Sequence, residues 1–191
     1  MAEHYYLVSS LPFLRLKELP PIKYNDFLDN CLSWLNKNEM SQIRNSRIDI
    51  ENILLGQVTN SVLKDWIVFE NSLRNELVRI RANETGISAD QYIRTDIESD
   101  PVIFSVVREA VKAPSPLKIE MNFIELRWKF LEQYEVGHYF DLTALVLYGL
   151  KLQLLERQSL FDISKGQKVF HTIYEGNKDE EERKYRENSS N

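Results

Sequence analysis

Three histidines are the first residues to consider for chemistry, because an imidazole can act as a metal ligand or as a general base. They are His4, His138 and His171. None has a second histidine one helical turn away, and no cysteine cluster accompanies them. His138 lies near Glu135 and Asp141, which leaves open a ligand or metal site at these three residues. We expect a structural role instead, with His138 packed or capping at a junction between two helices.

The carboxylates and the cysteine favour the same interpretation. Glu120, Glu125 and Glu132 fall on one predicted helix without a histidine partner, so we interpret them as a solvated face. Cys31 is the only cysteine and lies on an apolar helix face, as a buried small hydrophobe would. The chain contains neither a glycine-rich phosphate loop nor a G-x-S-x-G nucleophile motif. We therefore predict a protein that is not an enzyme and has no catalytic residues, cofactor or metal.

Three arginines, Arg74, Arg79 and Arg81, form the most prominent polar cluster. Glu70 precedes Arg74 by one helical turn, the favoured orientation for an ion pair, and Arg81 lies two turns beyond Arg74 on the same face. Two interpretations stay open. The cluster is either a salt-bridge ladder on the surface or between helices, or a docking face for an acidic partner that uses Glu70, Arg74 and Arg81.

These residues are carried by a long predicted helix, residues 61–86, which has an apolar stripe. Its apolar residues recur at steps of three and four, as one face of a helix requires. They are Leu63, Trp66, Ile67, Phe69, Leu73, Leu77 and Ile80. A glycine, Gly86, is expected to end this helix.

The rest of the chain also reads as helical, with one exception. Residues 5–10 are predicted to be a short extended segment. Asp100 followed by Pro101 is a strong helix start, and Asp141 is predicted to cap a helix that is apolar almost all round. The helix capped by Asp141 is expected to end near residue 159. Further helices or helical turns are expected at 25–36, 88–93, 101–112, 117–135 and 163–174, together with a short helix that starts at Ser41 and one from Asp49 to Gly56. The predicted fold class is therefore all-α, a compact multi-helix bundle with two long amphipathic helices.

Proline and charge set the expected domain organisation. The segment Pro114-Ser115-Pro116 is the clearest break between predicted helices. We predict an N-terminal helical lobe at 1–113 and a C-terminal helical lobe packed on it at 117–176. Residues 177–191 are nearly all charged or polar and are predicted to be a disordered tail.

Composition narrows the classes of function. The chain has 191 residues and a net charge of -5, which disfavours binding driven by neutralising nucleic-acid phosphates. A nucleic-acid regulator that uses the face from Arg74 to Arg81 is thus the weakest alternative. The N-terminus does not resemble a secretory signal, and no apolar run approaches the roughly 20 residues that span a bilayer. We expect a cytoplasmic protein without direct membrane insertion.

Three phrases of the sequence resemble a known family. They are YYLVSSLP near the start, WIVFENSLRNELVRIRA in the long helix, and the closing run RWKFLEQYEVGHYFDLTALVLYGLKLQLLERQSLFDISKGQKVF. The more specific parts are a W-x-x-F-E-x-x-L-R-N phrase beginning at Trp66 and a G-x-K-L phrase beginning at Gly149. They resemble a bacterial family encoded beside the genes of V/A-type ATPases. That family is distantly similar to the C-type stalk component of those enzymes, the counterpart of the eukaryotic d-type component.

The resemblance implies a role in protein assembly. The C-type component is an all-helical funnel without catalytic residues that joins the membrane rotor ring to the central stalk. The expected function is a non-enzymatic interaction component or assembly protein of a proton- or sodium-translocating V/A-type ATPase. Its partners would be ATPase subunits on the central stalk or membrane rotor side, and it would be peripheral to the inner membrane through them. The alternative is a helical ligand- or metal-binding enzyme with a site near His138, Glu135 and Asp141.

Overall fold

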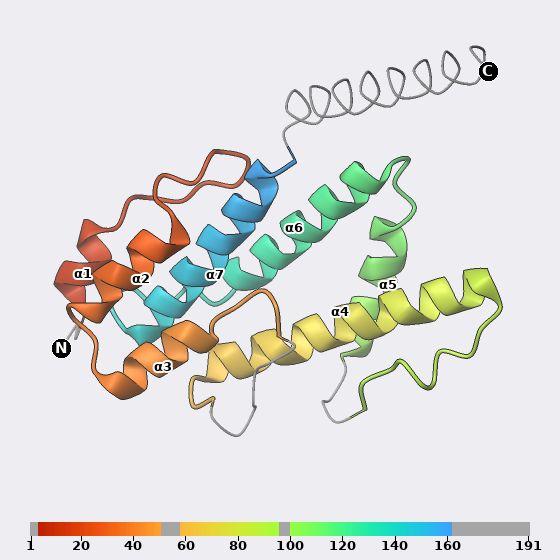
Figure 1. Cartoon of the computed structure of the whole chain (residues 1–191), viewed down its shortest axis with the longest axis horizontal. Coiled ribbons are helices and arrows are strands. Elements are labelled where there is room, and N and C mark those ends of the chain that lie inside the picture. The colour runs from red at the N-terminus through yellow and green to blue at the C-terminus, as the bar shows by residue number, and fades with distance from the viewer. Residues whose placement is uncertain (1–3, 51–57, 96–99, 162–191) are drawn as a thin grey trace, which may run out of the picture. The chain divides into compact units, whose positions relative to one another are not determined.

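The computed structural model describes residues 4–50, 58–95 and 100–161, and it is helical throughout these ranges apart from turns and connections (Figure 1). Seven α-helices and no strand occur in them. The helices are α1 (Tyr5–Ser10), α2 (Tyr24–Leu32), α3 (Lys37–Asn45), α4 (Ser61–Thr85), α5 (Pro101–Ala110), α6 (Pro116–Glu132) and α7 (Leu142–Ser159). The predicted all-α fold class is confirmed.

Residues Met1–Gln158 form one compact unit, and Ser159–Asn191 are grouped separately. The division into lobes at 1–113 and 117–176 stays a prediction, and residues on both sides of the expected break at Pro114–Pro116 belong to the first unit. The predicted helix at 163–174 and the predicted tail at 177–191 lie outside the described residues. Most of the helix predicted from Asp49 to Gly56 lies outside them as well.

The long helix α4 begins and ends close to where the sequence predicts. Gly86 follows it with a φ of 70°, a left-handed conformation that glycine adopts without strain. The cap at its start is Asn60, whose Oδ1 accepts a hydrogen bond from the Leu63 amide at 3.0 Å. The helix start predicted at Ser61 thus has its capping residue one position earlier.

Two predicted helix starts are confirmed. Asp100 accepts a hydrogen bond from the Val102 amide at 2.9 Å, and Pro101 occupies the first turn of α5. Asp141 accepts one from the Ala144 amide at 2.9 Å at the start of α7. The predicted start at Ser41 is wrong, because Asn36 caps α3 by accepting from two backbone amides.

Residues 5–10 form the helix α1, so the prediction of an extended segment there is wrong. The one buried residue of this helix is Leu7, and the His4 amide just before it bonds to the Phe140 carbonyl at 3.1 Å. A six-residue helix is too short to show a helical period, and tertiary contacts decide its conformation.

The helical turn expected at 88–93 is a single turn centred on residues 90–92. The amides of Tyr92 and Ile93 both bond to the Ala89 carbonyl, at 2.9 and 3.2 Å. No helix continues from it within the described residues, so this segment serves as part of the connection from α4 to α5.

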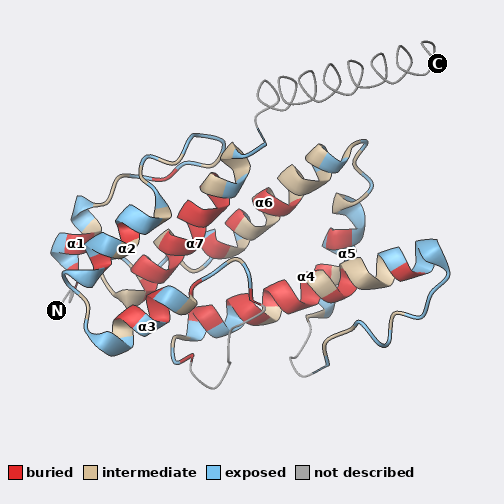
Figure 2. Cartoon of the chain, in the orientation of Figure 1, coloured by how far each residue is buried: buried red, intermediate tan, exposed pale blue. Residues whose placement is uncertain are grey.

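Buried residues, red in Figure 2, are most numerous on α4, α6 and α7 and also occur on each of the other helices. Trp66 and Phe69 on α4 pack against Phe130 on α6, with ring centroids 6.0 and 4.3 Å apart. The interior of α7 is buried from Leu145 to Leu155 except for the half-buried Tyr148. This agrees with the expectation that an almost uniformly apolar helix is central.

On α2, Cys31 is fully buried, and burial raises the pKa of its thiol to about 12. The thiol therefore stays protonated near neutral pH, where only a thiolate would be an effective nucleophile. This places Cys31 among the packing residues, as the sequence predicts.

Candidate functional site

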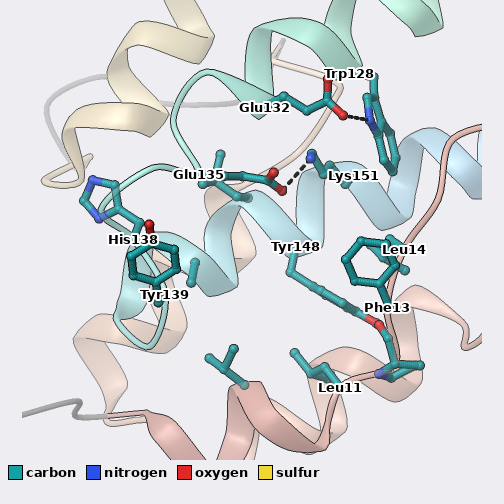
Figure 3. A pocket seen from close by; sticks show the side chains of 14 residues that line it. Leu11, Phe13, Leu14, Trp128, Glu132, Glu135, His138, Tyr139, Tyr148 and Lys151 are labelled. Atoms are coloured by element: carbon teal, nitrogen blue, oxygen red, sulfur yellow. Dashed lines mark hydrogen bonds and ion pairs between the residues drawn. The ribbon is translucent and has the colours of Figure 1, made fainter.

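The sequence offers two candidate sites, one at His138 and one on the charged face of α4, and the structure gives each a definite geometry. The first is a pocket of about 380 Å³ between the 11–14 segment and the facing sides of α6 and α7 (Figure 3). Its apolar wall comes from residues such as Leu11, Phe13, Leu14 and Leu147. Its ionisable groups include Glu132, Glu135, His138 and Lys151. We call it the Lys151 pocket.

Lys151 is the most constrained charged group of this pocket. Its side chain is 6% exposed, and its Nζ lies 2.5 Å from Glu135 Oε1. The same ammonium lies 4.6 Å from the centre of the Trp128 ring, within range of a cation–π interaction. Trp128 is itself oriented by a 2.7 Å hydrogen bond from its Nε1 to Glu132. The ammonium is thus compensated on two sides and is held in one place.

Tyr148, on the same helix as Lys151, also lines the Lys151 pocket and reaches toward the 11–14 segment, as Figure 3 shows. Its hydroxyl donates a 3.0 Å hydrogen bond to the carbonyl of Pro12 and so ties the 11–14 segment to α7. Burial raises the pKa of Tyr148 to about 12, so the hydroxyl remains a donor across the physiological range.

The predicted alternative site consists of Glu135, His138 and Asp141, and the structure brings His138 close to each of the other two in a different way. Glu135 and His138 both line the Lys151 pocket. Asp141 bonds to His138 Nδ1 through one carboxylate oxygen, at 2.5 Å, while its other oxygen caps α7. Within the described part of the chain, no group of three or more His, Cys, Asp or Glu side chains is placed to hold a metal ion. The arrangement offers an apolar cavity whose ammonium, that of Lys151, is already paired with Glu135.

The second candidate site is the charged face of α4, on which Glu70 is predicted to contact a partner. In the structure Glu70 is fully buried. Both of its carboxylate oxygens accept hydrogen bonds from Arg127 on α6, at 2.5 and 3.1 Å. Burial alone would lower the pKa of Arg127, but the charge and the hydrogen bonds of Glu70 outweigh it and raise that pKa. Glu70 is therefore not part of a docking face, and its assignment as a partner-binding residue is corrected. For this residue the inter-helix salt bridge is the right interpretation.

A second buried carboxylate on α4, Glu76, is one that sequence reasoning missed. It lies 2.5 Å from Arg108 Nε on α5 and 3.4 Å from Arg79 on α4 itself. The pairing with Arg79 at three residues' separation is a signal that the sequence does contain. The pairing with Arg108 joins α4 to α5 and has no local signal.

The polar residues of α4 also hold the connection that returns from it to α5. Asn75 bonds to both the carbonyl and the amide of Arg94, at 2.8 and 3.0 Å. The hydroxyl of Ser72 accepts from the Asp100 amide at 2.7 Å. A face that looks solvent-exposed on a helical projection is thus covered by backbone that it binds.

The remaining two residues of the predicted docking face lie nearer the surface. Arg74 bonds to Asp49 at 3.2 Å and is 31% exposed. Arg81 is exposed, and no ion pair to another described residue is found for it. Both line a groove of about 540 Å³ along the C-terminal half of α4, which we call the Arg81 groove.

The Arg81 groove combines an apolar floor with charged edges. The apolar residues include Leu73, Leu77, Ile80, Val111, Ile119 and Phe123. The charged residues are Arg74, Arg81, Arg127, Arg157, Glu84 and Glu120. Arginine therefore outnumbers glutamate by two to one in its lining, although the chain as a whole carries a net charge of -5.

A third surface, which the sequence did not single out, is formed by aromatic side chains around α1. Tyr5 and Tyr6 are 49% and 73% exposed, and Trp34, which follows α2, is 60% exposed. The ring of Tyr6 stacks on Trp34 at 6.4 Å, and Tyr5 lies 4.8 Å from Phe140. We call these four residues the aromatic cluster. Its signal in the sequence is the adjacent pair of tyrosines near the N-terminus.

In comparisons with known proteins, no family model, curated protein or solved structure matches the chain. None of the described helices is both long enough and apolar enough to cross a lipid bilayer.

Proposed function

We propose that this protein is a non-enzymatic docking component or assembly factor of a V/A-type ATPase, acting on the cytoplasmic side of the complex. The identity of the partner is supported by the resemblance of three sequence phrases to a family encoded beside the genes of that enzyme. The mode of action is supported by the surfaces and internal bonds of the folded chain.

The observation that carries the proposal is the exposure of the aromatic cluster. Tyr6 and Trp34 stack on each other while each remains more than half exposed, and contiguous exposed apolar surface often marks an interaction site. Tyrosine and tryptophan are also enriched at the centres of protein interfaces, where they supply large contact areas with little loss of conformational entropy. Tyr6 and Trp34 are thus the expected anchors of a docking surface.

The internal ion pairs support the second half of the proposal, a body that holds its shape under load. Glu70–Arg127 joins α4 to α6, and Glu76–Arg108 joins α4 to α5. Both carboxylates are fully buried, whereas Arg127 is 14% and Arg108 64% exposed. Such pairs add little net stability but penalise any arrangement that separates a buried carboxylate from its arginine. Because Glu70 and Glu76 both lie on α4, this helix cannot slide along its neighbours without leaving a buried carboxylate unpaired.

Co-purification tests the proposal. The tagged full chain should recover V/A-type ATPase subunits from gently solubilised membranes of the cells that produce it. The double variant Tyr6→Ser/Trp34→Ser should recover far less, because it removes both aromatic anchors. Tyr92→Ser is the matched control, since Tyr92 is also 60% exposed and is not part of the cluster. Recovery of no ATPase subunit by the wild-type chain would contradict the proposal.

A second candidate function rests on the Lys151 pocket, whose volume and apolar wall suit a small ligand with an apolar body. It corresponds to the alternative of a helical ligand-binding protein near His138 and Glu135. Its test is a thermal-shift screen of small, mainly apolar compounds of different charge. A rise in melting temperature that is lost in Lys151→Met would favour it, and a screen without any such rise would count against it.

A further inference from the structure

We infer that the Arg81 groove binds an acidic amphipathic helix of the partner protein, with apolar side chains on the groove floor and carboxylates at the arginines. This inference rests on the proposed function in one respect, namely that a protein partner exists. It adds the chemistry of that partner and a surface distinct from the aromatic cluster.

The floor of the groove is apolar but incompletely covered. Leu73 and Phe123 are 1% and 5% exposed and form its base. Leu77, Ile80 and Ile119 are only partly buried, although they pack on the core. Burying the rest of such surface is favourable by about 25 cal/mol per Å², so apolar side chains would enter this groove in preference to water.

The edges of the groove supply hydrogen-bond donors for carboxylates. A guanidinium has five N–H donors, and the ion pairs described above use only some of them. Arg157 is 46% exposed and bonds to Glu120 through Nε at 2.5 Å, so that bond does not occupy its terminal nitrogens. Arg81 makes no ion pair with another described residue. Arg81 and Arg157 are therefore the two arginines best placed to meet an incoming carboxylate.

The same edges disfavour a nucleic acid or a free phosphate. Glu84 and Glu120 line the groove beside the arginines and would repel a densely charged phosphate chain. The acidic net charge of the protein adds a longer-range repulsion. Single carboxylates separated by apolar residues carry a lower charge density, so both repulsions are smaller for them, and an amphipathic helix presents them at steps of three and four.

The groove and the aromatic cluster are far enough apart to act independently. Helix α7 begins just after Phe140 of the cluster and carries Arg157 of the groove in its last turn. At about 1.5 Å per residue, the part of the helix between them spans roughly 20–25 Å. Two contacts at that separation would fix both the position and the orientation of this chain on its partner.

The test uses the full-length chain and a designed peptide of about 18 residues, long enough to form a helix in isolation. The peptide carries leucine at helical spacing on one face and glutamate at the flanks, with a fluorescent label for anisotropy. A second peptide replaces every glutamate with lysine. We expect the glutamate peptide to bind the wild-type chain at least about tenfold more tightly than the lysine peptide.

Variants assign that binding to the groove. Arg81→Glu and Arg81→Gln should weaken binding of the glutamate peptide, the former by about tenfold or more. Arg44→Glu is the matched control, because Arg44 is an exposed helical arginine outside the groove. Circular dichroism melts verify that each variant is folded. Equal binding of both peptides, no binding of the glutamate peptide, or equal affinity in Arg81→Glu and Arg44→Glu would overturn the inference.

Failure of this inference can be told apart from failure of the proposed function. If Arg81→Glu still recovers ATPase subunits as well as the wild type does, and the peptide result is negative, the groove assignment fails while the ATPase proposal stands. If the peptide binds through Arg81 but no ATPase subunit is recovered, the groove stands and its partner is a different protein with an acidic helix.

Discussion

Glu70 and Arg127 show at the residue scale why a charged helix face is not always a surface. The side chain of Glu70 is 0% exposed and that of Arg127 is 14% exposed, so each depends on the other for compensation of its charge. Removal of one partner leaves an isolated charge in a medium of low polarity. The pair therefore acts as a structural element that joins two helices.

The prediction that follows concerns the free energy of unfolding. Arg127→Met should lower it by about 3–5 kcal/mol, because Glu70 is left buried and unpaired. The double variant Glu70→Met/Arg127→Met should lose less than the sum of the two single variants, since no charge remains in the core. Urea unfolding of the four proteins measures this coupling. Losses that simply add would show that the two residues do not depend on each other.

At the scale of elements, the close approach of α7 to α2 depends on Gly149. A Cβ at this position would lie 3.0 Å from Cε1 of Phe27 and 3.6 Å from the Ser46 hydroxyl. Phe27 is fully buried and packs against Tyr148 with ring centroids 5.2 Å apart, so its ring has little freedom to move aside. The G-x-K-L phrase thus contains a glycine needed for close packing.

We expect Gly149→Ala to destabilise the protein even though alanine is the better helix former. The helix preference favours alanine by about 1 kcal/mol, whereas overpacking a core costs typically about 1–3 kcal/mol. The double variant Gly149→Ala/Phe27→Leu should recover part of the loss by making room for the methyl group. The melting temperatures of the wild type and both variants test this prediction. A higher melting temperature for Gly149→Ala would show that the Phe27 ring can move away from the added methyl group.

The elements also show what a sequence pattern can predict. Helix α4 is predictable because its apolar residues repeat over many turns, and α5 and α7 because Asp100 and Asp141 begin them with recognised caps. The helix α1 is not, because six residues show no period. The caps Asn36 and Asn60 are not predicted, because Ser41 and Ser61 are also of a residue type that often begins a helix.

The candidate sites are predictable only where they depend on neighbours along the chain. His138 and Asp141 are three residues apart, so their hydrogen bond follows from the sequence. The partner of Glu70 is Arg127 on another helix, and no local spacing connects them. In the W-x-x-F-E-x-x-L-R-N phrase, Glu70 and Asn75 make internal bonds that hold the fold together, whereas Leu73 and Arg74 line the Arg81 groove.

At the scale of the whole molecule, the proposals describe a helical body that meets a partner at two places. The aromatic cluster supplies apolar anchors, and the Arg81 groove supplies charge complementarity. The Lys151 pocket lies between α6, α7 and the 11–14 segment, and its lining residues belong to neither surface. Variants at one surface should therefore leave binding at the other measurable.

The most direct measurement is the binding of the purified full-length chain to purified V/A-type ATPase, followed by surface plasmon resonance. We predict saturable binding of the wild-type chain, strongly weakened binding of Tyr6→Ser/Trp34→Ser, and unchanged binding of Tyr92→Ser. No saturable binding of the wild-type chain, or equal binding of all three proteins, would contradict the proposed docking role.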